Sequence, residues 1–137
     1  MSMLGCIFEP TSVTPGLQAA ATLSQAAPAQ NTYYNVLAAT LNVTLYSVQV
    51  AVATTGETLQ VAFVIDGQTF TGTQAAVAGT TYYAYLTPAG AIGFSTTASP
   101  AFNGTVPLSG RSVQVKVEKT TNNGTGTITG TAIYGMQ

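Results

Sequence analysis

Histidine and tryptophan are absent from this 137-residue chain, and only 5% of its residues are charged. A typical soluble domain is about 25% charged. Without histidine, the Ser-His-Asp and Cys-His catalytic arrangements are excluded. A zinc site would lack its usual ligands, because the chain also has only one cysteine. Since acid–base catalysis relies on side chains that are scarce here, we expect a protein that is not an enzyme and uses no cofactor.

The few charges form neither a patch nor a catalytic pair. The formal net charge is -1, so there is no basic surface for nucleic acid. Glu57 and Asp66 are the closest carboxylate pair, but they lie in turns at opposite ends of one predicted strand, about 30 Å apart. Lys116 and Lys119, the candidates for a Ser-Lys pair, occupy positions that we expect to be solvated. These charges therefore predict no active site.

Membrane and secretion signals are missing as well. No run reaches about 18 consecutive apolar residues, so we expect no membrane helix. Cys6 is the only cysteine, which excludes an intrachain disulfide. The chain shows no basic segment followed by an apolar one, as a secretory signal would require. We therefore expect synthesis and retention in the cytosol, or export by another route.

The composition changes near residue 30. Residues 1–30 contain three prolines and an Ala/Gln run at 18–27 that would form either a short helix or an extended arm. From Asn31 onward Thr, Val, Tyr and Gly dominate, and β-branched and aromatic residues favour strands. We therefore divide the chain into an N-terminal arm, 1–30, extended or partly helical, and a single β domain, 31–137.

Alternating apolar residues predict the strands of this domain. Between residues 42 and 53 the apolar positions change parity near Tyr46, which predicts a β-bulge or a crossing between two sheets. In 112–119, Val113, Val115 and Val117 face inward, whereas Gln114, Lys116 and Glu118 face outward. The predicted strands cover residues 32–38, 42–53, 59–65, 68–71, 81–86, 91–95, 112–119 and 125–134.

The sequence predicts two hairpins between neighbouring strands. Asp66-Gly67 between two alternating runs is typical of a type I′ turn, whose two central residues both have positive φ. A second hairpin is expected at 120–124, between the strands 112–119 and 125–134. Short strands punctuated every 8–12 residues predict an all-β, antiparallel two-sheet β-sandwich of jelly-roll or Greek-key type, with an extended N-terminal arm.

Aromatic and apolar side chains supply the candidate interface residues. Tyr82 lies on the opposite face of its strand from Tyr83 and Tyr85, and exposed tyrosines can stack on sugars or anchor an interface. The alternative is that they fill the core and keep their hydroxyls near its rim. The possible interface residues are Leu4, Ile7, Phe8, Tyr82, Tyr83 and Tyr85. Sequons for N-glycosylation occur at Asn42, Asn103 and Asn123, the last at a predicted hairpin tip.

A nearly uncharged β domain is prone to associate in solution, because charge normally keeps protein molecules apart. The sequence thus predicts a non-enzymatic virion structural protein: a capsid, decoration or surface-projection subunit that self-associates, assembles in the host cytoplasm, and contacts copies of itself and other structural subunits. The arm would reach a neighbour by strand addition or as an apolar peg. The alternatives are an extracellular fibre, pilin-like or surface-layer subunit and, third, a carbohydrate-binding module with glycan partners.

Overall fold

The computed structural model describes residues 17–104 and 107–137, and this part of the chain is all-β, without a helix. The predicted all-β class is therefore confirmed. Eight antiparallel strands form one hydrogen-bonded sheet. The strands are β2 (Gln18–Gln25), β3 (Tyr34–Val52), β4 (Thr58–Ile65), β5 (Gln68–Ala75), β6 (Tyr82–Leu86), β7 (Ile92–Ser95), β8 (Leu108–Lys119) and β9 (Ile128–Met136).

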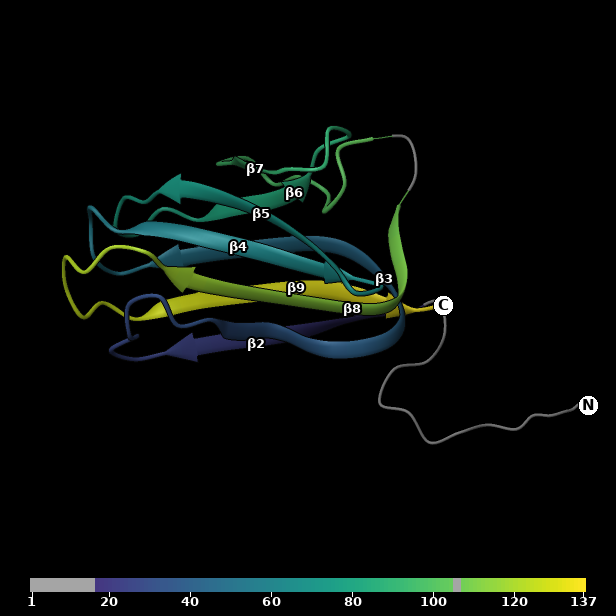
Figure 1. Cartoon of the computed structure of the whole chain (residues 1–137), viewed down its shortest axis with the longest axis horizontal. Helices are drawn as coiled ribbons and strands as arrows, with labels where there is room; N and C mark the ends of the chain where they lie inside the picture. Colours follow the sequence, from purple (N-terminus) through teal and green to yellow (C-terminus); the bar gives the residue numbers. More distant parts are fainter. Residues whose placement is uncertain (1–16, 105–106) are drawn as a thin grey trace, which may run out of the picture.

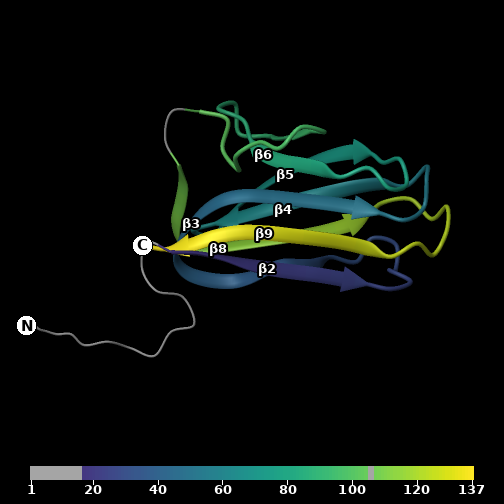
Figure 2. The ribbon, with the colours of Figure 1, turned by 180° about the vertical axis from the view of Figure 1, so that it is seen from behind.

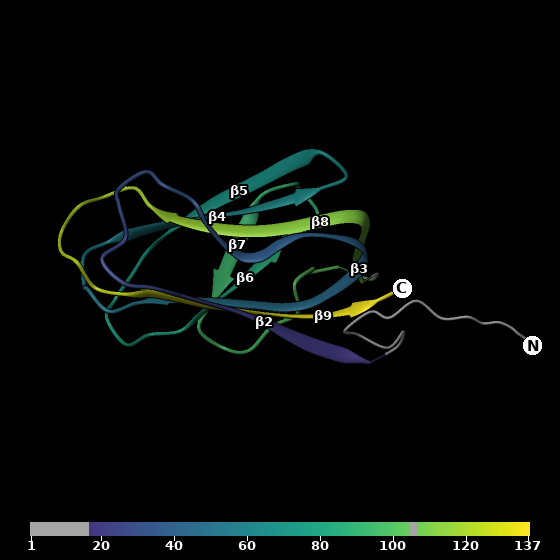
Figure 3. The same ribbon diagram turned by 90° about the horizontal axis from the view of Figure 1, so that it is seen from below.

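The strands run in the order β2-β9-β3-β8-β4-β5, and β6 joins β3 to β7 (Figures 1 and 2). Seen from below, the sheet turns over on itself, so that β5, β4 and β8 face β2 and β9 (Figure 3). The layers come close where Gly130 of β9 meets Val36 of β3: a Cβ on Gly130 would lie 2.8 Å from a Val36 methyl carbon. A larger residue at position 130 would push the layers apart.

β3 is the strand that connects the layers. Its first half pairs with β8, and its second half pairs with β9 and β6. The two separate strands predicted at 32–38 and 42–53 are one continuous strand with register shifts. The irregularity predicted near Tyr46 is confirmed, because Leu45 pairs with Tyr134 while Ser47 pairs with Ile133. A strand this long must bend to serve both layers, and the irregularities provide the bend.

The apolar alternation seen in the sequence defines the core. Leu59, Val61 and Phe63 of β4 are fully buried, as are the inward valines of β8. On β3 the buried positions change parity across the Tyr46 bulge, from Val43 and Leu45 to residues 48, 50 and 52. Each buried aliphatic side chain contributes about 1.5–3 kcal/mol to folding. The predicted inward set of valines at positions 113, 115 and 117 is thus confirmed.

One predicted hairpin is confirmed and the other is wrong. Asp66 and Gly67 have φ values of 52° and 84°, as a type I′ turn requires, and they join the paired strands β4 and β5. β8 and β9, by contrast, do not form a hairpin, because β3 lies between them in the sheet. The 120–127 segment therefore crosses from one layer to the other.

Part of the segment that the sequence assigned to the arm forms an edge strand of the sheet. The Ala/Gln run forms β2, which pairs with β9 from Gln18↔Gly135 to Gln25↔Ile128. Its side chains alternate between exposed and half-buried, and none is fully buried. β2 therefore adds main-chain hydrogen bonds to the sheet edge but little to the core.

Candidate functional site

Two features of the described residues stand out: a buried polar cluster between β4 and β8, and sheet edges without charge. The cluster centres on Glu57 and Lys119, each 1% exposed. Lys119 Nζ lies 3.1 Å from Glu57 Oε2, and it also donates to Asn122 Oδ1 at 3.3 Å and to the Gly124 carbonyl at 2.6 Å. All three ammonium hydrogens therefore have acceptors.

The Glu57 carboxylate is equally well satisfied through its other oxygen. Oε1 accepts hydrogen bonds from the Thr121 hydroxyl and, at 3.1 Å, from the Asn123 backbone N–H. The Thr121 hydroxyl in turn accepts from the Thr58 N–H, and Asn123 Nδ2 donates to the Gly56 carbonyl at 2.6 Å. These contacts fasten the loop after β8 to the turn before β4.

The surroundings of Glu57 set its ionisation. Burial alone would raise the pKa of this carboxyl, but the hydrogen bonds from Thr121, Asn123 and Lys119 outweigh burial and hold the pKa below its ordinary value. Glu57 is thus held as a carboxylate, and together with Lys119 it forms a structural clamp that joins the loop after β8 to the turn before β4.

The expectation that Lys119 is solvated is wrong, and Glu118, on the opposite face of β8, is also buried, at 8% exposed. The sequence did hold a signal for the clamp. Lys119 has the same parity as the inward valines of β8, and Glu57 has the parity of Leu59 and Val61. Since alternate residues of a strand share a face, the parity of Lys119 points it toward the core, and Glu57 has the matching parity in the turn just before β4.

Tyr33 forms a smaller polar contact on β8. Burial, with a hydrogen bond and charge from Glu118, raises the pKa of Tyr33 to about 12. Lys116 Nζ lies 4.8 Å from the centre of the Tyr33 ring, a cation–π distance. Lys116 and Glu118 are thus both engaged at the sheet rather than free in solvent.

The candidate interface tyrosines do not form one exposed cluster. Tyr82 is 5% exposed, and its hydroxyl accepts a hydrogen bond from the Val77 N–H at 3.0 Å. Tyr83 and Tyr85 are half-buried on the other face of β6, and Tyr85 lies against Gly93. The other three candidates, Leu4, Ile7 and Phe8, lie outside the described residues.

The three sequon asparagines differ in whether the side-chain amide is already hydrogen-bonded. The side-chain nitrogen of Asn123 is already committed to the Gly56 carbonyl. Asn103 and Asn42 are exposed, and Asn42 has a φ of 55° within β3. A glycan on Asn123 would therefore break a contact that holds the clamp loops together.

The strands at the two ends of the sheet order carry no charge. β2 reads QAAATLSQ and β5 reads QTFTGTQA, so neither holds a charged residue or a proline. Among the described charges, Glu57, Glu118 and Lys119 are buried, which leaves only Asp66, Arg111 and the half-buried Lys116 at the surface. Monomeric proteins normally protect such edges with lysine, proline or bulges.

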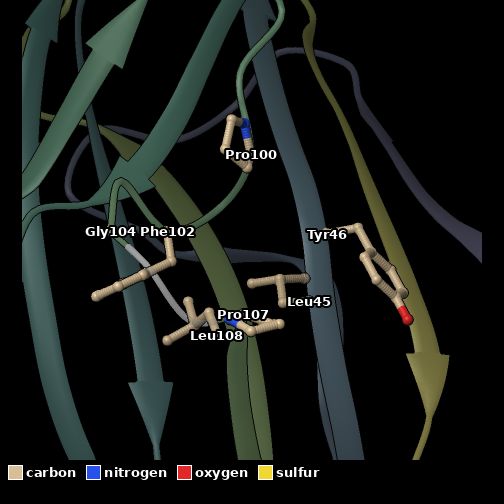
Figure 4. A pocket seen from close by; sticks show the side chains of 7 residues that line it. All are labelled: Leu45, Tyr46, Pro100, Phe102, Gly104, Pro107 and Leu108. Carbon is tan, nitrogen blue, oxygen red and sulfur yellow. The ribbon is translucent and has the colours of Figure 1, made fainter.

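A cavity of about 290 Å³ opens at the end of the molecule where β8 begins (Figure 4). Leu45 and Leu108 point into it from β3 and β8, and Phe102 lies opposite them; Tyr46 points away, to the far side of β3. The described part of its lining holds no charged residue, so that part of the cavity can take an apolar group.

Comparisons with protein-family models, curated proteins and solved structures found no match for this chain. Within residues 17–104 and 107–137, acidic, histidine and cysteine side chains nowhere gather in threes as a metal site would need. The same residues contain no helix of the length and apolarity needed to cross a membrane.

Proposed function

We propose that this chain is a non-enzymatic structural subunit of a virion, a capsid, decoration or surface-projection protein, that works by self-association of its folded sheet. The observation that carries the proposal is the pair of uncharged edge strands, β2 and β5. Among the described strands β2 pairs only with β9, so its outer edge presents a row of N–H and C=O groups that another chain can pair with, whereas Gly72 of β5 lies against the Ile92 backbone of β7. In an assembled particle, those groups would be satisfied by a neighbouring subunit.

The distribution of charge supports the same proposal. Half of the described charged side chains are withdrawn from the surface, as the clamp and Glu118 show. A surface with so few charges gives weak repulsion between copies and little response to pH or salt. Both properties suit a subunit covered by neighbours in a lattice that is later exposed to changing surroundings.

The finer architecture and location belong to this proposal as well. The turned-over sheet would be a β-sandwich of jelly-roll or Greek-key type, built in the host cytoplasm and carried outside within the virion. The partners would be copies of itself and other structural subunits, rather than nucleic acid or membrane. The segment holding Leu4, Ile7 and Phe8 would supply an apolar peg to a neighbour.

A second candidate is an extracellular fibre, pilin-like or surface-layer subunit. It is favoured by the position of β2, an edge strand close to the N-terminal end of the described chain, as strand addition between successive subunits requires. Open head-to-tail contacts would give a fibre, whereas closed symmetry would give a defined oligomer. The size distribution in solution distinguishes the two.

The test is the mass of the full chain in solution, measured by light scattering after size exclusion. We expect a defined oligomer or larger assembly. Lysines on the exposed positions of an edge, Thr22→Lys with Ser24→Lys on β2, or Thr71→Lys with Thr73→Lys on β5, should lower that mass, because lysines on an edge strand oppose its pairing with another chain.

The matched control places one lysine at Thr96, an exposed residue outside the strands. It should leave the mass unchanged. A full chain that stays monomeric at high concentration would contradict the proposal. In that case glycan binding by Tyr83 and Tyr85, abolished by their replacement with alanine, would become the function to measure.

A further inference from the structure

We propose that β2 is exchanged between two copies of this chain, so that Gln18–Gln25 of one copy pairs with β9 of the other. The inference rests on the proposed self-association and gives it a mechanism. The occupant of the β9 edge is thus a defined segment, the β2 strand of a second copy. Three observations carry it: how β2 is held, the backbone before Pro28, and the anchor that follows.

β2 is held by main-chain pairing and not by burial. All eight of its residues pair with β9. None of its side chains is fully buried, and only Ala21 and Leu23 pack against the core cluster. The same pairs and contacts can form with a second copy, since the two chains are identical. Exchange therefore loses none of the interactions that hold β2 in place.

The link that follows β2 is strained when β2 folds back on its own chain. Ala27 has a φ of 45°, in the left-handed region, where a β-carbon crowds the following carbonyl. Ala27 also precedes Pro28, and the residue before a proline strongly prefers an extended backbone. Opening the link would return Ala27 to the extended conformation and release this strain.

The strained link is short and ends at a firm anchor. The Asn31 N–H donates to the Lys119 carbonyl at 2.8 Å, and Gln30 Nε2 donates to the Thr120 carbonyl at 2.8 Å. Between the last residue of β2 and this anchor lie only residues 26–29. Short hinge loops under strain favour strand exchange, because the closed form alone carries the strain.

A cysteine pair across the β2–β9 register tests the exchange. Ser24 pairs with Thr129, and both are exposed. Ser24→Cys and Thr129→Cys, in a Cys6→Ser background, are oxidised at concentrations where the protein is assembled, and then run on a denaturing gel without reductant. Exchange predicts disulfide-linked dimers. An intrachain disulfide, seen as oxidised monomer, would overturn the proposal. Thr22→Cys with Thr131→Cys, on the same face, serves if the first pair fails to oxidise or to fold.

The hinge itself is tested by a glycine that tolerates positive φ. Ala27→Gly relieves the strain of the closed link and should lower the dimer–monomer equilibrium constant about fivefold. Ala29→Gly makes the same chemical change at a residue of ordinary φ and should lower it much less. Equal effects of the two variants would contradict the hinge mechanism.

The outcomes separate this inference from the function on which it rests. An assembled protein with intrachain disulfides would overturn strand exchange alone and leave self-association in place. A protein that is monomeric by light scattering would overturn both. Assembly with interchain disulfides supports both.

Discussion

Every residue of β2 is paired with a neighbouring strand, and β8 is paired on both sides, yet different interactions hold the two strands in place. β8 lies between β3 and β4, buries Val113, Val115 and Val117, and ends in the Lys119 clamp. β2 pairs on one side only and buries no side chain completely. Main-chain hydrogen bonds contribute about 1 kcal/mol each because water can replace them, whereas burial cannot be replaced by solvent. Main-chain pairing therefore sets the position of a strand in the sheet, and burial of its side chains supplies most of the free energy that keeps it there.

The largest expected effect comes from placing the same charge on each strand. Val115→Asp puts a carboxylate without a partner in the core and should abolish folding, because its cost approaches the total stability of about 5–15 kcal/mol. Leu23→Asp on β2 should leave the protein folded. Circular dichroism and denaturant unfolding measure both, and Lys116→Ala on the outer face of β8 is the control of small effect. A folded Val115→Asp protein would refute the assignment of β8 to the core.

Breaking the clamp should have the next largest effect. Lys119→Met leaves the Glu57 carboxylate buried without its cation and should cost about 3–5 kcal/mol in the free energy of unfolding. Adding Glu57→Gln removes the remaining charge, so the double variant should be more stable than the single one. Lys116→Met, which removes only a cation–π contact, should cost about 1 kcal/mol or less. A double variant as unstable as the sum of the singles would mean that the pair is not coupled.

Acid should loosen the clamp without altering β2. The pKa of Glu57 is lowered in the folded protein, so the folded state gains stability from the ionised form at pH values above the ordinary carboxyl pKa of about 4.3. This gain is lost as the pH falls through the lowered folded pKa. The unfolding free energy of the native chain should therefore decrease below about pH 4 more steeply than that of Glu57→Gln. Parallel pH profiles would show that Glu57 contributes nothing to acid stability.

Much of the fold followed from local pattern. The alternating valines of β8 and the Asp66-Gly67 turn each depend on neighbours in the sequence, and the structure has both. The parity change near Tyr46 likewise predicted the bulge of β3. The predicted β8–β9 hairpin failed because a short turn-like segment says nothing about a third strand, and β3 occupies the position between them.

For the candidate sites too, some features followed from local sequence pattern and others depended on contacts between distant segments. Lys119 could have been assigned to the buried face by parity, since it continues the inward series of β8, whereas Glu57 lies in the turn before β4 and only shares the parity of its buried residues. That they meet could not have been assigned in this way, because they are 62 residues apart and the β4–β8 register brings them together. The strain at Ala27 was also beyond the sequence, since only closure of β2 onto β9 imposes it.

The sequence by itself determined that this protein is all-β, nearly uncharged and without histidine. Those properties depend on composition and on the two-residue period of a strand, which are local. The tertiary structure decided that three of the few charges lie buried, that β3 connects both layers, and that uncharged strands form the sheet edges. Those outcomes depend on which distant segments pair, and pairing is settled by the burial gained when the whole sheet closes around its core.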